Sequence, residues 1–172
     1  MFLIKIKNFW TKKIVKKRLN NSTLLNSESS VVNVGIILDE TYFFEREKFV
    51  EELLNNGINR GNIQLLVFKD KLKKNESFKY PVFSYKNLSW TSSVSGEAYK
   101  CFVAQNFDML ISYYDVEKTP LLLATYESKA KFKVGFTSVD KRLNHFMIHS
   151  NAENYAVFLE ELFKYLKILN KI

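Results

Sequence analysis

The chain has 172 residues, 47% of them hydrophobic, and a net charge of +8 at pH 7. A chain of this length and hydrophobicity typically forms one domain that buries about 70% of its unfolded surface, which excludes a largely disordered protein. The single cysteine, Cys101, excludes an internal disulfide framework and fits a reducing cytoplasm, and its apolar neighbours predict a buried, inert thiol.

The first segment, residues 1–22, holds most of the excess charge. It contains seven cations and no acid, whereas the other 150 residues are nearly neutral, with 19 cations and 18 acids. The pattern predicts a basic amphipathic helix that gathers its apolar and aromatic residues on one side; these are Phe2, Leu3, Ile6, Phe9, Trp10 and Ile14. The residues expected to contact an anionic partner are Lys5, Lys7, Trp10, Lys12, Lys13, Lys16, Lys17 and Arg18.

Three interpretations of this helix remain open at the level of sequence. Its aromatic side would dock on the rest of the chain or on a second copy, with lysine stems reaching outward. Alternatively, aromatic rings with lysines suit the headgroup layer of an anionic membrane. The third interpretation is contact with RNA, including ribosomal RNA, although arginine is scarce and no RNA-binding signature is found.

A polar linker, residues 23–30, separates the helix from an α/β domain, residues 31–172. Periodicity and turn residues predict the first elements of this domain. The expected elements are a strand at 31–38, a helix from Tyr42 to Asn55 that Gly57 stops, strands at 63–68 and 80–85, and a helix from Ser93 or Ser95 to Gln105.

The central unit, residues 107–136, reads as strand, helix and strand. The apolar run 107–114 fits a strand that is covered on both faces. Thr119 and Pro120 mark a helix start as N-cap and first helical residue, and residues 132–136 alternate like a strand. Such a connection is long enough for a right-handed crossover between parallel strands.

After the central unit we expect an extended piece at 146–148 and a closing helix from Ser150 or Asn151 to Asn170. The alternation of strands and helices predicts the fold class: an α/β, three-layer, Rossmann-like architecture with a mostly parallel open sheet of about five strands. A basic helix is expected at the N-terminus, ahead of the α/β domain.

Ligands of such sheets bind beyond the carboxyl ends of the strands. The residues expected at this edge are Asp39, Thr41, Asp115, Ser138, Lys141 and Arg142. Carboxylates mixed with cations would hold a phosphate or a divalent ion, whereas the alternative is that these residues form loops and helix caps, which favour the same amino acids.

Several chemical motifs are missing from the sequence. None of the five glycines forms a G-x-G pair, so we expect no bound dinucleotide or other cofactor. His145 and His149 flank an extended piece, which predicts no metal site, and no nucleophile elbow occurs. We therefore expect no catalytic residues.

The string FDMLISYYD…LLLATYESKAKFKVGF resembles an uncharacterised family of small proteins from Bacteroidota, from about Val31 to the C-terminus. The order D-x-L-I … A-x-F-K-V-G-F is similar, more remotely, to the N-terminal half of heptosyltransferase-type glycosyltransferases. The first resemblance implies no known activity, and the second implies a Rossmann-like half-domain.

Two hypotheses of function follow. The first is a non-catalytic cytoplasmic protein, peripheral to the inner membrane or bound to RNA, the ribosome or a protein complex through its basic helix. The alternative is a small transferase-like enzyme that acts on a sugar or phosphorylated substrate at the carboxyl edge of the sheet. Its support is analogy of fold.

Overall fold

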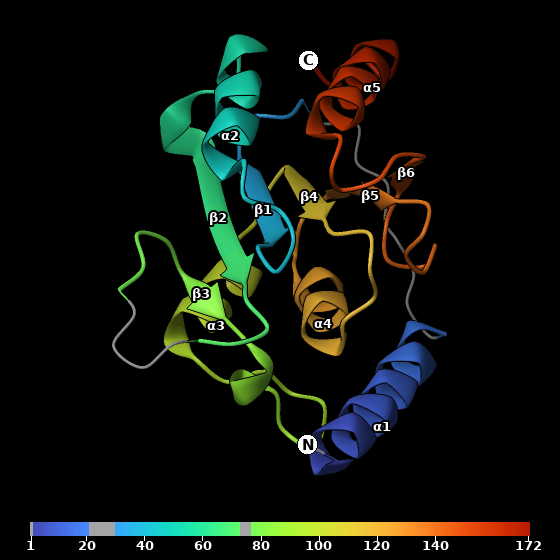
Figure 1. Ribbon diagram of the computed structural model, residues 1–172. Coiled ribbons are helices and arrows are strands. Elements are labelled where there is room, and N and C mark those ends of the chain that lie inside the picture. The colour runs from blue at the N-terminus through green and yellow to red at the C-terminus, as the bar shows by residue number, and fades with distance from the viewer. Residues whose placement is uncertain (1, 21–29, 73–76) are drawn as a thin grey trace.

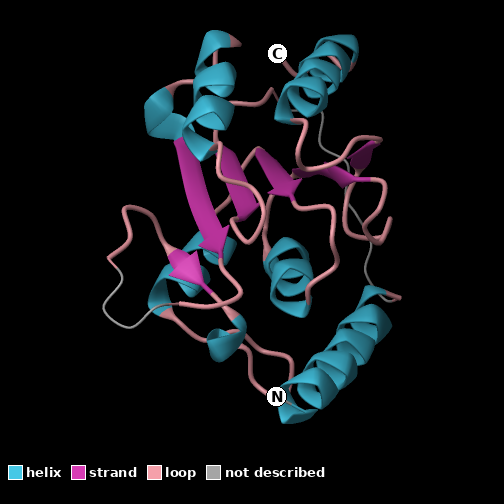
Figure 2. Ribbon diagram, in the orientation of Figure 1, coloured by secondary structure: helices cyan, strands magenta, loops and turns pink. Residues whose placement is uncertain are grey.

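The computed structural model describes residues 2–20, 30–72 and 77–172 (Figure 1). Its sheet has six strands in the order β3-β2-β1-β4-β5-β6, and every pair is parallel (Figure 2). The strands are β1 (Val34–Asp39), β2 (Ile63–Phe68), β3 (Val82–Phe83), β4 (Met109–Tyr113), β5 (Phe132–Phe136) and β6 (Phe146–Ile148). The predicted α/β class is confirmed, and the expected extended piece is the sixth strand because it pairs with β5.

Helices cover both faces of this sheet. They are α1 (Phe2–Leu19), α2 (Arg46–Asn55), α3 (Glu97–Ala104), α4 (Thr119–Glu127) and α5 (Tyr155–Ile168). Figure 1 shows α2 and α5 on one face and α3 and α4 on the other, with α1 outside α4. The architecture is therefore the predicted three layers, to which α1 adds a fourth.

Strand β4 shows why the middle of the sheet is buried on both faces. Tyr113 packs towards α2 and α5, with ring centroids 4.6 Å from Phe49 and 5.1 Å from Phe158. On the other face, the Ser112 and Tyr114 hydroxyls lie 2.9 and 2.7 Å from Thr125 Oγ1 of α4. Both faces of this strand thus need cover, which explains its unbroken run of large residues.

Several helix ends differ from the prediction. Helix α2 begins at Arg46 rather than Tyr42, because the backbone N–H of Thr41 donates to Asp39 Oδ1 at 2.9 Å and makes a turn instead. Gly57, at φ +92°, follows α2 as expected. Thr119 is the first helical residue of α4 and not its N-cap, and α5 begins at Tyr155 after the capping side chain of Asn154.

The prediction of a buried thiol is wrong. Cys101 is exposed on α3, because Tyr99 and Phe102 supply the buried side of this short helix. Its Sγ lies 3.6 Å from Glu97 Oε1, and the hydrogen bond to that carboxylate raises the pKa of the thiol. A raised pKa lowers the thiolate fraction of Cys101.

Helix α1 docks on its own chain, but not by the face that the sequence suggests. Thr11, Val15 and Leu19, spaced four residues apart, are buried and bring α1 against α4. The aromatic side instead faces away: Phe9 is 68% exposed and Trp10 is 54% exposed. The interpretation that the aromatic side docks on the domain is therefore wrong: the helix docks, but through Thr11, Val15 and Leu19.

Most of the predicted linker, residues 23–29, lies outside the described residues, so the boundary between helix and domain stays a prediction. Across the three described ranges, no helix combines the length and the apolar character needed to cross a bilayer.

Candidate functional site

The sheet reverses its direction of winding between β1 and β4, and the carboxyl ends of these strands form the crest of the sheet. In a doubly wound fold this switch point is where ligands bind. Here the ammonium group of Lys118 lies at the crest. It is 2.7 Å from Asp39 Oδ2 and 3.0 Å from Asp70 Oδ1, and it donates to Thr41 Oγ1 at 2.8 Å.

This ammonium group is shielded from water. The side chains of Lys118 and Asp39 are each 8% exposed, and the Lys118 Nζ lies 5.0 Å from the ring centroid of Tyr42 and 5.1 Å from that of Phe68. Burial, together with the carboxylates of the crest, also raises the pKa of the Tyr85 hydroxyl. The Lys118–Asp39 pair is thus desolvated, whereas the Asp70 side chain is 37% exposed, and the charge of Lys118 is balanced from within the chain.

The predicted residues at the sheet edge fall into two groups. Asp39 and Thr41 contact Lys118, as described above. The other group lies beyond β4 and β5: Asp115 Oδ2 accepts the backbone N–H of Ala152 at 2.9 Å, and the Ser138 hydroxyl donates to the Asp115 carbonyl at 2.8 Å. Within the described residues, no hydrogen bond or ion pair joins the two groups.

Arg142 of the second group turns towards α1. Its guanidinium pairs with Asp140 and donates to the Lys16 carbonyl at 3.2 Å and to the side chain of Asn20. Lys141 beside it is exposed. The structure therefore does not gather the predicted edge residues into one pocket, and most of them stabilise loops.

Sequence reasoning missed Lys118 and Asp70. The signal was present, because Asp70 follows β2 closely and Lys118 immediately precedes the Thr119–Pro120 helix start, at the carboxyl ends of two strands of a parallel sheet. Among the described residues, no cluster of three or more histidine, cysteine or acidic side chains is suited to a metal ion.

Helix α1 divides the eight residues predicted to contact an anionic partner into two sets. Four turn towards the chain itself: Lys12 and Lys16 lie 2.8 and 3.0 Å from Glu117 Oε2, while Lys7 and Arg18 donate to backbone carbonyls of residues 88–92. Burial acts to raise the pKa of Glu117, but hydrogen bonds from the two lysines hold it below its usual range.

What we term the outward face of α1 comprises the other four, Lys5, Trp10, Lys13 and Lys17, together with Phe9. All five side chains are exposed. The rings of Phe9 and Trp10 meet edge to face at 6.4 Å, and the Lys13 Nζ lies 5.8 Å from the Trp10 ring centroid. The face contains no acid, since α1 itself has none.

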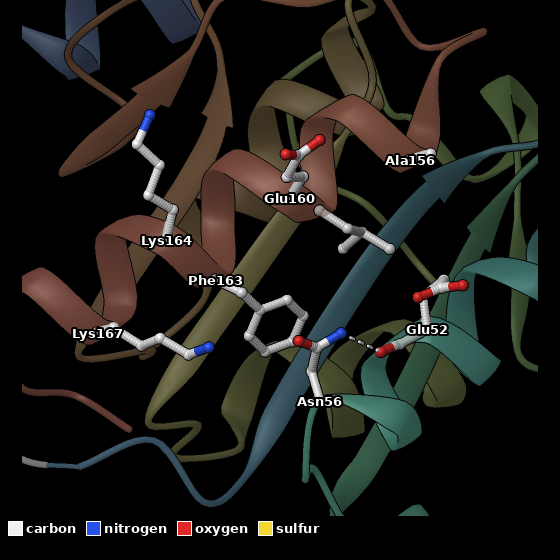
Figure 3. Close-up of a pocket in the computed structure, with 8 residues that line it drawn as sticks. Glu52, Asn56, Ala156, Glu160, Phe163, Lys164 and Lys167 are labelled. Carbon is white, nitrogen blue, oxygen red and sulfur yellow. Dashed lines mark hydrogen bonds between the residues drawn. The ribbon is translucent and has the colours of Figure 1, made fainter.

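A groove of about 460 Å³ adjoins the outward face, and Trp10, Lys13, Lys17 and Arg142 are among its lining residues. A second groove, of about 430 Å³, lies between α2 and α5 (Figure 3). Two acids, Glu52 and Glu160, and two lysines, Lys164 and Lys167, line this second groove. Its charges balance, whereas those of the groove beside α1 favour an anion.

Fold and site together define the class: a Rossmann-like α/β protein whose crest is occupied by its own lysine and which carries a basic, aromatic helix on one side. The chain belongs to a family of unknown function, DUF6913, whose model matches residues 7–169. Comparison with curated proteins and with solved structures gives no match.

Proposed function

We propose that the protein binds the surface of an anionic membrane through the outward face of α1, as a non-catalytic, peripheral protein of the cytoplasm. The observation that carries this proposal is the separation of the two sides of α1. The inward cations are neutralised by Glu117 or bonded to carbonyls, whereas Lys5, Lys13 and Lys17 surround an exposed aromatic pair. Rings and ammonium groups in this arrangement suit a headgroup layer.

The docking of α1 supports the proposal energetically. A free basic segment must become helical when it meets a membrane, and that ordering lowers its affinity. Helix α1 is already formed, and buried Val15 and Leu19 hold it against the domain. Its lysines and rings are therefore presented to a partner without further folding.

The identity of the exposed cations on α1 favours lipid over RNA as the partner. Arg18, the only arginine of α1, donates to the carbonyls of Ser92 and Thr91 at 2.9 and 3.2 Å, and a guanidinium is the cation best suited to phosphate and base recognition in RNA. The exposed cations are all lysines, which suit diffuse attraction to anionic lipid.

The test is co-sedimentation with vesicles that contain either phosphatidylcholine alone or phosphatidylcholine with phosphatidylglycerol. We expect binding to the anionic vesicles only. Replacing two outward lysines, Lys13→Gln with Lys17→Gln, should weaken binding by roughly tenfold or more, because each lysine contributes about 1 kcal/mol near an anionic surface.

The matched control is the double variant Lys164→Gln with Lys167→Gln, two exposed lysines of α5, at the other end of the molecule (Figure 1). It removes the same charge and should leave vesicle binding unchanged. Equal losses in both double variants would contradict a role of α1. Binding to a homopolymeric RNA that requires Lys13 and Lys17, without binding to vesicles, would assign the face to RNA.

The finer resemblances, to proteins of Bacteroidota and to the first half of heptosyltransferases, stay predictions, and with them the alternative of a small transferase. That enzyme would use Asp39 and Asp115 at the sheet edge. If a sugar phosphate raised the melting temperature of the protein and Asp39→Ala abolished this rise, the alternative would be favoured.

A further inference from the structure

A short tip, Leu88–Val94, lies beside α1 and presents the second tryptophan of the chain. Leu88 and Val94 form an antiparallel bridge, and the backbone N–H of Ser89 donates to the Ser93 carbonyl at 2.8 Å. Trp90 sits within this closed turn and is 55% exposed. We refer to this segment as the Trp90 tip.

The Trp90 tip is held by its own hydroxyl groups. Ser89 Oγ lies 2.8 Å from both Thr91 Oγ1 and Ser93 Oγ, and it accepts the backbone N–H of Ser93 at 3.1 Å. These contacts fix the turn on both sides of Trp90. An exposed indole on a turn that is already ordered loses little conformational entropy when it meets a partner.

The tip is also fastened to α1. Arg18 donates to the carbonyls of Ser92 and Thr91, Lys7 donates to the carbonyl of Leu88, and the Ser92 hydroxyl donates to the Thr11 carbonyl at 3.3 Å. These bonds place the tip along one flank of α1, beside Lys7, Thr11 and Arg18.

The Trp90 ring lies beside Lys7 of α1. The Lys7 Nζ lies 5.9 Å from the Trp90 ring centroid, and Trp10 comes one helical turn after Lys7 on α1. Residues 84–96 contain no acid, as α1 contains none. Neither the tip nor α1 therefore contributes an acid, and each carries an exposed indole, Trp90 on the tip and Trp10 on the outward face.

We propose that Trp90 is a second lipid anchor, which enters the headgroup layer of an anionic membrane together with the outward face of α1. The indole has an apolar body and one N–H donor, which is the chemistry that favours the membrane–water interface. Two anchors on different elements fix the orientation of the protein on the membrane. This inference rests on the proposed function, and it adds a contact that α1 alone does not supply.

Because Trp10 and Trp90 are the only tryptophans of the chain, the experiment separates the two anchors. The full-length variant Trp10→Phe leaves Trp90 as the sole reporter, and Trp90→Phe leaves Trp10. Each is titrated with phosphatidylglycerol vesicles, and its emission and its quenching by brominated lipid are recorded. We expect a shift to the blue and quenching in both variants.

A third reporter provides the control. Ile168→Trp, in a chain that carries Trp10→Phe and Trp90→Phe and so keeps an aromatic ring at both anchors, places an indole at a site that is 63% exposed on α5, the helix at the opposite end of the molecule from α1 (Figure 1). Its emission should not change. A response from this reporter would indicate adsorption in every orientation and would overturn the inference.

The outcomes distinguish this inference from the proposed function. If Trp10 responds and Trp90 does not, membrane binding by α1 stands and the second anchor is refuted. If neither responds, both proposals fail. Affinity supplies an independent measure: Trp90→Ser should weaken vesicle binding by roughly tenfold, as expected for one buried aromatic side chain, and Ile168→Ser should not.

Discussion

Charged side chains are paired and mostly buried at the crest of the sheet but exposed on the outward face of α1. At the crest, one ammonium group meets two carboxylates and a hydroxyl, and little of it reaches solvent. On α1, three lysines and two aromatic rings are exposed without an acid on the helix. The charged groups of the crest pair with one another, whereas the exposed lysines of the outward face have no acid on their own helix.

The difference teaches where to look for a partner. A Rossmann-like crest normally offers backbone N–H groups to a ligand, but here a side chain of the same protein takes that place. An exogenous ligand would first have to displace Lys118 from its carboxylates. The outward face needs no displacement, which is why we propose it as the binding surface.

The largest expected effect tests the crest. Lys118→Met should lower the free energy of unfolding by about 3–5 kcal/mol, because it leaves the carboxylate of Asp39 buried without its cation. Chemical denaturation at pH 7 measures this, with Lys141→Met, at an exposed lysine, as the control. If Lys118→Met lowers the free energy of unfolding no more than Lys141→Met does, the cluster does not stabilise the fold.

The next effect separates the two sides of α1. Leu19→Ala removes a side chain that is 1% exposed and should cost about 2–5 kcal/mol. Trp10→Ser, on the outward face, should change stability by less than about 0.5 kcal/mol and should instead weaken vesicle binding. Equal destabilisation by both variants in a denaturant titration would show that the outward face also packs within the protein.

A second buried lysine sharpens the account of Lys118. Lys133 donates to the carbonyls of Thr125 and Tyr126 at 2.7 and 3.4 Å, and burial lowers its pKa to about 8. Below pH 8 the folded and unfolded states are both protonated at this lysine. Between about pH 8 and about pH 10.4, the unfolded state binds more protons, so stability should rise with pH.

Lys133→Met removes this dependence and is the reference for the measurement. The stability of the wild-type protein relative to Lys133→Met, obtained from urea titrations, should increase by about 1–3 kcal/mol between pH 8 and pH 10. If the difference in stability does not change with pH, Lys133 is not desolvated. It would then offer no contrast to the paired Lys118.

The smallest expected effect concerns the pairing of α1 with Glu117. Glu117→Gln should cost about 0.5–1 kcal/mol at pH 7, since its lysine partners are partly exposed. Because the pKa of Glu117 is lowered in the folded state, the stabilisation is present above the unfolded pKa of about 4.3 and is lost as the pH falls further. Thermal unfolding of wild type and variant should therefore converge once the pH falls below the lowered pKa of Glu117.

Sequence predicted most of the elements, but it predicted the sites less well. Strands β1 and β4 were recognisable because burial on both faces demands unbroken apolar runs. The start of α2 was placed too early, because Phe43 fits a helical pattern while it packs 4.8 Å from the Tyr113 ring. Which charges meet at the crest depends on strand order, and local periodicity does not contain strand order.

By itself, the sequence determined the fold class and the concentration of positive charge in the first helix, since both follow from local patterns of residues. Only the tertiary structure decided which side of that helix faces the protein. Leu19 and Val15 are buried in the helix that contacts α4, and Phe9 and Trp10 are exposed, because four-residue spacing and the partners offered by Glu117 and the Trp90 tip fix the rotation of α1. Those partners lie far along the chain, so their positions arise from folding alone.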